Sequence, residues 1–290
     1  FSRPETLKRY ILRKKPGIVG IYVTSATKNN VYELVSDLKR HRSLKGIYII
    51  GFGPAISYQD EAFIEAGAAM LAVGNGEATM LEIMENLKNG ASPFLDHIKG
   101  MVFKNAKGGI TKNEERGKVP DINSLPLPNR EAIPMKKYLD AWKAQYGYNA
   151  VTITTRREDN GNAGENNRKS PENVVAELNQ IKRKYKPDRI CFLDDAFTKN
   201  SDWLKGFCEE LKKQGVQTAF ECNAQFEDIN ESVIELLQSS GCVKVWLKAL
   251  SPVDQLIGQM GQHGKKTQLL RDSGVNVGLE LLLECNGESD

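Results

Sequence analysis

The sequence lacks the features that mark membrane-spanning, exported or nucleic-acid-binding proteins. No apolar run reaches the roughly 18 residues needed to cross a bilayer, and the amino-terminal segment has no apolar signal-peptide core. The net charge is only +3, and basic and acidic residues are mixed rather than gathered into a basic stripe. We therefore expect a small-molecule cofactor or substrate as partner, and no nucleic acid or membrane. The chain also does not begin with methionine, so we expect a fragment or a processed form.

Cysteine is scarce and shows no metal-binding spacing. None of the five cysteines forms a C-x-x-C pair with another. Cys191, Cys222 and Cys242 lie in apolar, strand-like runs, and a metal site made from them would need distant residues to converge. We interpret them as reduced, buried thiols in a cytoplasmic protein.

The composition is that of a folded protein with room for two domains. The chain has 290 residues, of which 40% are hydrophobic and 27% charged. Apolar strand-like runs alternate with helical spacing in two blocks, which predicts an α/β fold with parallel sheets and right-handed crossovers. Between the blocks, prolines interrupt the pattern, and a small hairpin is indicated around Lys107-Gly108. We predict a first domain over 1–100, a proline-rich connector over 101–148 and a second domain over 149–290.

The second domain carries five expected strands. They are Ala150–Thr155, Asp188–Leu193, Gln217–Cys222, Cys242–Ala249 and Val275–Leu283. A closed parallel barrel needs about six to eight strands, so we expect a partial barrel cut off after the fifth strand. Ser170-Pro171 predicts the start of the first helix of this domain, and Ser201 the cap of the next.

Two glycine-bearing turns follow strands of the first domain. One is GFGP, with Gly51 and Gly53, and the other is GNGE, with Gly74, Gly76 and Glu77. At the carboxyl end of a strand, a glycine backbone can approach a flat ligand closely, so we take these residues as candidate cofactor contacts. The alternative, that the glycines serve only the turn, stays open.

A pair of carboxylates, Asp194 and Asp195, ends one strand of the second domain. At the mouth of a barrel they would accept hydrogen bonds from ribose hydroxyls or amino groups of a cofactor or substrate. The alternative is a helix-capping aspartate beside a solvated one. We interpret His41 at a helix end, His97 in the connector and His263 in a polar turn as solvated side chains rather than metal ligands.

Taken in order, several stretches resemble the cobalamin-binding-domain class of radical S-adenosylmethionine enzymes. They are KPGIVGIYVTSATKNN, the Gly74–Glu77 turn, DINSLPLPNREAIP, RKSPENVVAELNQIKRKYKPDRICFLDDAFTKN, ELLQSSGC and the closing NGES. The resemblance covers nearly the whole chain. It implies a Rossmann-like, corrinoid-binding domain followed by a partial TIM barrel. In that family the barrel binds a four-iron four-sulfur cluster and S-adenosylmethionine, which is cleaved to a 5′-deoxyadenosyl radical.

The chain departs from the family where the cluster would be held. The family loop reads T-x-R-G-C-x-x-x-C-x-x-C, and aligned from Thr154 and Arg156 it places Arg157 at the glycine. The cysteine positions become Glu158, Asn162 and Glu165. Carboxylate and amide oxygens are hard donors that do not hold iron–sulfur clusters, which need thiolates. We therefore expect no cluster. Glu158 and Glu165 as ligands of a divalent cation are a less favoured alternative to two solvated glutamates.

Other family contacts are also altered. The G-x-E-S turn after the fourth barrel strand begins here with Lys248, and the arginine after the third strand is Gln225. No D-x-H-x-x-G motif offers a histidine to cobalt, and the first βα unit of the first domain is missing. Cobalamin and S-adenosylmethionine are still the cofactors that the resemblance implies.

We therefore expect a relative of the cobalamin-dependent radical enzymes whose iron–sulfur site is lost or replaced, and which is catalytically inactive. One alternative is a non-catalytic binding or scaffold protein that uses the former cofactor cleft. Another is an active radical enzyme whose cluster ligands lie outside this fragment. The sequence leaves the substrate and the reaction open, because one fold serves many reactions.

Overall fold

The computed structural model describes residues 4–74, 76–90, 96–116, 121–157, 167–249 and 253–281. The chain divides into two compact units, with the main boundary between Pro120 and Asp121. None of the helices in these described ranges is long and apolar enough to cross a membrane.

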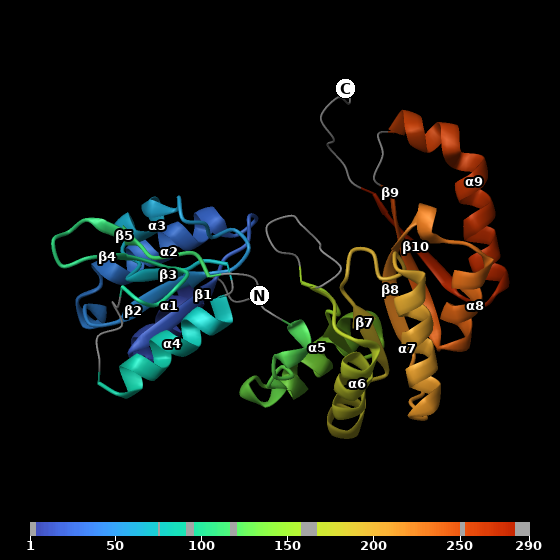
Figure 1. The fold of residues 1–290 in the computed structure, drawn as a ribbon, viewed down its shortest axis with the longest axis horizontal. Coiled ribbons are helices and arrows are strands. Elements are labelled where there is room, and N and C mark those ends of the chain that lie inside the picture. Colours follow the sequence, from blue (N-terminus) through green and yellow to red (C-terminus); the bar gives the residue numbers. More distant parts are fainter. Residues whose placement is uncertain are drawn as a thin grey trace. The chain divides into compact units, whose positions relative to one another are not determined.

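The first unit contains a mixed five-stranded sheet, sheet A, in the order β1-β2-β3-β4-β5 (Figure 1). The strands are β1 (Ile18–Tyr22), β2 (Tyr48–Phe52), β3 (Met70–Ala72), β4 (Met101–Lys104) and β5 (Ile110–Lys112). The first three are parallel, as the strand–helix alternation predicted, and β4 and β5 are antiparallel. The hairpin predicted around Lys107-Gly108 is confirmed. It extends sheet A, however, so the first unit does not end at residue 100 and the connector begins later than predicted.

Helices cover both faces of sheet A. They are α1 (Pro4–Lys14), α2 (Lys28–Arg40), α3 (Glu61–Glu65) and α4 (Gly76–Lys88). Neighbouring residues of a strand point to opposite faces. Accordingly Ile49 packs in one core with α1, α2 and α3, whereas Ile50 packs in another with Ile83 of α4. Two separate apolar cores therefore hold the sheet between its helices.

The second unit contains a five-stranded parallel sheet, sheet B, in the order β10-β9-β8-β7-β6. The strands are β6 (Ala150–Ile153), β7 (Arg189–Phe192), β8 (Phe220–Gln225), β9 (Cys242–Ala249) and β10 (Asn276–Leu281). All five predicted strands are confirmed, although β8 lies three residues later than expected. Chain order equals sheet order, as in the wall of a parallel barrel.

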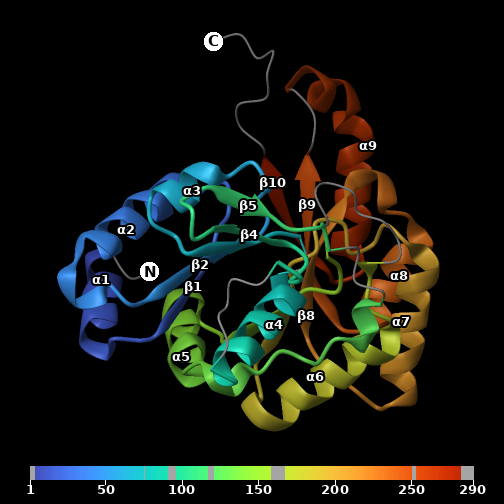
Figure 2. The same cartoon turned by 60° about the vertical axis from the view of Figure 1, so that its left-hand side comes forward.

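One face of sheet B is covered by helices (Figures 1 and 2). They are α6 (Pro171–Tyr185), α7 (Ser201–Lys213), α8 (Glu231–Ser239) and α9 (Val253–Asp272). Ser170 caps α6 as predicted, because its hydroxyl accepts from the Asn173 N–H. The predicted cap of α7 is wrong. The side chain of Asn200, not Ser201, accepts from the Trp203 N–H at 2.9 Å, so Ser201 is already the first helical residue.

The connector contains a helix that the sequence reading missed, α5 (Met135–Tyr146), which ends at Gly147. Met135 and Leu139, four residues apart, pack against the core of the second unit, while Tyr138 and Tyr146 are exposed. Because several prolines precede the helix, the sequence predicted an extended connector here instead of a helix. The later part of the predicted connector therefore belongs to the second unit.

Candidate functional site

The carboxyl end of β6 is closed into a short two-stranded ribbon. The Lys169 N–H donates to the Thr155 carbonyl at 2.7 Å, and the Arg157 N–H donates to the Asn167 carbonyl at 2.8 Å. Arg156 pairs with a residue of the returning segment, Arg168, in an antiparallel bridge. The ribbon fixes the two ends of the loop in which the family carries its cluster ligands. The positions concerned, Glu158, Asn162 and Glu165, lie outside the described residues.

Asp194 ties the end of β7 to the end of β6. Its carboxylate is buried, and both oxygens accept from the Thr155 N–H, at 2.9 and 3.0 Å. Burial raises the pKa of Asp194, although this hydrogen bonding and the charge of Arg168 act in the opposite direction. Asp194 therefore holds two strand ends together and is not a helix cap.

Asp195 lies in a different environment from its neighbour. Its side chain is 62% exposed and forms an ion pair with Lys248 at the carboxyl end of β9. The Lys248 ammonium also lies 3.7 Å from a carboxylate oxygen of Glu280 on β10. Burial tends to lower the pKa of Lys248, but the two carboxylates outweigh it and raise that pKa. The structure therefore separates the predicted carboxylate pair into one buried and one exposed group.

Arg168 is held against the aromatic core beneath this edge. Its guanidinium carbon lies 3.5 Å from the ring centre of Trp203, and its Nη2 donates to the Phe197 carbonyl at 2.7 Å. Burial lowers the pKa of Arg168 to about 10, and the charge of Arg156 adds to that effect while Asp194 opposes it. The sequence did not predict this cation–aromatic contact, because Arg168 and Trp203 come from different elements.

A buried ion network joins the connector to α6. Glu177 is 1% exposed, and its two oxygens accept from Arg130 Nη2 at 2.6 Å and Lys169 Nζ at 2.7 Å. Arg130 Nη2 also donates to the Thr152 carbonyl of β6 at 3.3 Å. The sequence reading missed this network, because the residues come from three separate segments and no local spacing links them.

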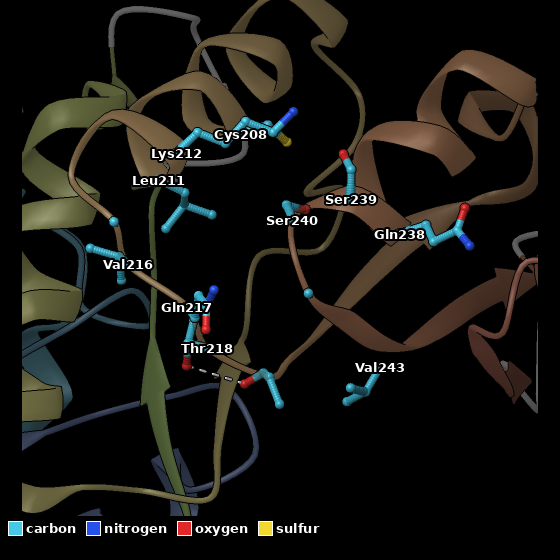
Figure 3. A pocket seen from close by; sticks show the side chains of 13 residues that line it. Cys208, Leu211, Lys212, Val216, Gln217, Thr218, Gln238, Ser239, Ser240 and Val243 are labelled. Carbon is cyan, nitrogen blue, oxygen red and sulfur yellow. Dashed lines mark hydrogen bonds between the residues drawn. The ribbon is translucent and has the colours of Figure 1, made fainter.

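Beside this network lies a pocket of about 200 Å³. The connector segment Leu125–Pro128 lines it, together with Arg156, Arg157 and Lys169. It is the described pocket nearest to the strand end where the family places its cofactor chemistry. A second surface pocket, of about 740 Å³, lies at the opposite end of the sheet, between the carboxyl ends of α7 and α8 (Figure 3).

The face of sheet B that the helices leave uncovered is polar. Its centre is Glu221 on β8, which accepts from Arg189 at 2.7 Å, Tyr148 at 2.9 Å and Trp246 at 3.2 Å. Burial acts to raise the pKa of Glu221, but these donors outweigh it and lower that pKa. A closed TIM barrel fills this space with branched apolar side chains, so this polar face is suited to ligands or water instead.

The thiols of the described residues do not fit the needs of an iron–sulfur cluster. Cys208, Cys222 and Cys242 are buried in the core between helices and sheet, and Cys191 lies in the middle of β7. Burial raises the pKa of Cys191 to about 12 and also raises that of Cys208. Contact with Cys242, together with burial, raises the pKa of Cys222. Cys191, Cys208 and Cys222 are therefore thiols rather than thiolates at neutral pH, and thiolates are the ligands that clusters require.

The predicted histidine environments are partly corrected. His41 ends α2 and hydrogen-bonds the Ser43 hydroxyl, and His97 is exposed, as expected of solvated side chains. His263 is not in a polar turn but within α9, where its ring stacks on Phe226 with centres 3.9 Å apart. In the described ranges, no three His, Cys, Asp or Glu side chains are arranged to hold a metal ion.

The glycine turns of the first unit follow β2 and β3, which are neighbours in sheet A. A Cβ atom on Gly51 would lie 2.9 Å from the Phe63 ring, and one on Gly53 would lie 2.6 Å from the Val23 carbonyl oxygen. Both glycines are therefore required by the packing of the protein itself. Gly74, with φ of +71°, faces open space.

The remaining two candidates of that unit lie at the start of α4, where Gly76 is buried and Glu77 is exposed. Contact of any of these five residues with a corrinoid remains a prediction. His41 and His97, the two described histidines of the first unit, lie outside these turns.

No protein-family model matches the sequence. An uncharacterized methyltransferase of Pyrococcus horikoshii, PH0819, is 25% identical over 268 residues, which cover 88% of this chain and 56% of that protein. The chain thus spans little more than half the length of this relative.

Two solved structures are similar over almost the whole chain. The cobalamin-dependent S-adenosylmethionine radical enzyme OxsB, with aqua-cobalamin bound, gives a TM-score of 0.69 at 17% identity and covers 97% of this chain and 43% of that one. The radical S-adenosylmethionine methyltransferase TsrM of Kitasatospora setae, with cobalamin and a [4Fe-4S] cluster bound, gives 0.72 at 14% identity and covers 99% and 62%. The chain therefore has the fold of the cobalamin-dependent radical S-adenosylmethionine enzymes, as the resemblance in sequence predicted.

Proposed function

We propose that the chain is a ligand-binding protein built on the fold of a cobalamin-dependent radical enzyme, and that it neither holds an iron–sulfur cluster nor generates a radical. The observation that carries this proposal is the donor set. The positions aligned with the family cysteines are Glu158, Asn162 and Glu165, and the described cysteines lie elsewhere, in strands and helices of the second unit. Oxygen donors do not replace thiolates in such a cluster.

The carboxyl end of β9 in sheet B also supports the proposal. Lys248 stands where the family turn begins with glycine, and its ammonium is held between Asp195 and Glu280. A glycine lets the backbone approach a cofactor closely, whereas the long lysine side chain at this position occupies that space. This part of the edge therefore disfavours that cofactor, and we infer that binding of another ligand has taken its place.

Anaerobic iron–sulfur reconstitution tests the proposal directly. We expect the unmodified chain to retain far less than one iron per chain and to show no absorbance near 400 nm. A triple variant, E158C/N162C/E165C, restores the family donor set at the aligned positions. That variant should gain iron toward about four atoms per chain, the content of the cluster that Cys donors hold.

About four irons in the unmodified chain would overturn the proposal. Failure of the triple variant to bind iron, with the unmodified chain also empty, would instead show that the aligned positions are wrong. Both proteins should be compared by thermal unfolding first, so that misfolding is not mistaken for an absent site.

A second candidate, an active methyltransferase-type enzyme, is favoured by one observation. The curated relative is named a methyltransferase, and the chain spans only 56% of it, so further residues of a longer protein would have to complete the site. Formation of 5′-deoxyadenosine from S-adenosylmethionine under reducing conditions would support this candidate. A cobalamin titration followed by its visible spectrum tests whether the first unit keeps a corrinoid site.

A further inference from the structure

Exposed basic side chains gather at the amino edge of sheet A, opposite the edge that carries the glycine turns. Residues 13–17 lead into β1, residues 40–47 lead into β2, and residues 105–109 form the turn between β4 and β5. Because β1, β2 and β3 are parallel and β4 is antiparallel, the starts of the first three strands and this turn share one edge. We call its six exposed cations the basic edge: Lys14, Lys15, Arg42, Lys45, Lys104 and Lys107.

The cations of the basic edge are not neutralised within the described part of the chain. None of the six side chains makes an ion pair or a hydrogen bond with a described residue. The carboxylate of Asp37, close to this edge, is already shared by Lys8 at 3.2 Å and Arg40 at 2.8 Å. The segment before β3 contributes one exposed carboxylate, Glu65 at the end of α3. The edge therefore carries an excess of positive charge.

Helix ends explain only part of this charge. Both α1 and α2 end at this edge, and basic residues in a last helical turn offset the partial negative charge of the helix end. That reason applies to Lys14. Arg42 and Lys45 come after α2, however, and Lys104 and Lys107 belong to the hairpin, so no helix end calls for them. These side chains leave positive charge to which an external anion can bind.

The opposite, carboxyl edge of the same sheet has a different arrangement of charge. There the cations are paired with carboxylates, in Lys28–Asp60, Lys112–Glu61 and Lys99–Glu114. The expectation of no nucleic-acid partner depended on the mixing of charges along the chain. The fold separates these charges in space, because residues far apart in sequence meet at one edge of the sheet.

We propose that the basic edge binds the phosphate backbone of duplex nucleic acid. Neighbouring strands lie about 4.8 Å apart, so the edge from β1 to β5 is roughly 19 Å long and spans about five phosphates of one strand. None of the large exposed hydrophobic side chains of the described residues lies in the three segments. An edge without such side chains suits neither insertion into lipid nor stacking of unpaired bases. This inference goes beyond the proposed function and does not depend on it.

Fluorescence anisotropy of labelled DNA and RNA duplexes of about 16 base pairs, titrated with the whole chain at several salt concentrations, tests the inference. The logarithm of the DNA affinity should fall with the logarithm of salt at a slope of about −4 to −5, since each neutralised phosphate contributes roughly −0.9. Polyglutamate of equal charge and phosphatidylserine vesicles should bind at least about tenfold more weakly, because their anionic groups lack the regular spacing of a duplex backbone. Equal or tighter binding of either, or no binding of either duplex, would overturn the inference.

A triple variant locates the binding. Lys15→Gln/Arg42→Gln/Lys45→Gln should weaken the DNA duplex at least about a hundredfold at about 50 mM salt and make the salt slope shallower by about three, since each lost phosphate contact contributes roughly one. If this variant does not fold, Lys14→Gln/Lys104→Gln/Lys107→Gln makes the same test with the other three cations of the edge.

A control variant removes the same charge from exposed residues of the second unit. It is Arg183→Gln/Lys186→Gln/Lys205→Gln, and it should leave the salt slope unchanged. Lys186 matches Lys15 closely, because each follows a helix in the left-handed conformation, with φ of +44° and +47°, and precedes a proline. Equal losses of binding in the two folded triple variants would overturn the inference. Its failure leaves the proposed function untouched, because iron content is measured separately.

Discussion

The two ends of the carboxyl edge of sheet B carry the same kind of ion network with opposite signs. At the β6 end, the anion Glu177 lies between the cations Arg130 and Lys169, and all three side chains are at most 16% exposed. At the β9 end, the cation Lys248 lies between two anions that are 62% and 51% exposed, Asp195 and Glu280.

The difference shows how strongly burial decides the contribution of an ion network to stability. Buried charges cost several kcal/mol each when left without a partner, so the β6 network is strongly coupled to stability. Exposed pairs are screened by water and contribute little. The sign of the central group also differs, because one carboxylate is shared by two cations at the β6 end and one ammonium is shared by two carboxylates at the β9 end.

Breaking the buried network should have the largest effect. Glu177→Gln keeps the shape but leaves Arg130 and Lys169 buried without their anion, and we expect a loss of about 3–5 kcal/mol in the free energy of unfolding. Urea denaturation measures it. Glu131→Gln, which removes an exposed partner of Lys184, is the control and should cost less than about 1 kcal/mol. Equal losses in the two variants would contradict the role of burial.

A third network, around Glu221, should give an intermediate effect with a defined pH dependence. Its donors lower the pKa of Glu221 below the ordinary value of 4.5, so the folded state favours the charged form. The resulting stability is present above about pH 4.5 and is lost as the pH falls through the lowered pKa. Glu221→Gln should cost about 1.5–3 kcal/mol at pH 7, as expected for hydrogen bonds to a charged group.

The measurement is the free energy of unfolding between pH 3 and pH 7 for both proteins. The difference between them should shrink as the pH falls below about 4.5, because the unmodified carboxyl then becomes neutral too. A difference that stays constant over this range would contradict a charged Glu221 at neutral pH.

Removing the exposed network should have the smallest effect. Lys248→Met frees Asp195 and Glu280, both of which water can solvate, and we expect a change of less than about 1 kcal/mol in the free energy of unfolding. The measurement is the same denaturation at low and at high salt. A loss approaching that of Glu177→Gln would show that the two ends of the edge are equivalent, and the comparison would then fail.

Much of the fold could be predicted because its signals are local. The five strands of sheet B and the β4–β5 hairpin were readable from apolar runs and turn residues, and the Ser170 cap from its proline neighbour. Helix α5 was missed because the prolines around it dominate the pattern. The cap of α7 was misplaced by one residue, since Asn200 and Ser201 are both good caps and only the backbone conformation chooses between them.

The candidate site was less predictable because its partners are distant in sequence. Asp194 and Asp195 are neighbours in the chain, yet one accepts hydrogen bonds from Thr155, just after β6, and the other pairs with Lys248 on β9. Likewise, nothing local links Arg130, Lys169 and Glu177. Such contacts depend on which strands are neighbours and on the register between them.

The sequence by itself determined the α/β class, the family likeness and the absence of cysteine from the aligned cluster positions, because these depend on residue identity and local periodicity. Only the tertiary structure decided which charges are buried and which of them are paired. Electrostatic energy depends on distance and on exclusion of water, and neither is fixed until separate strands and helices pack together.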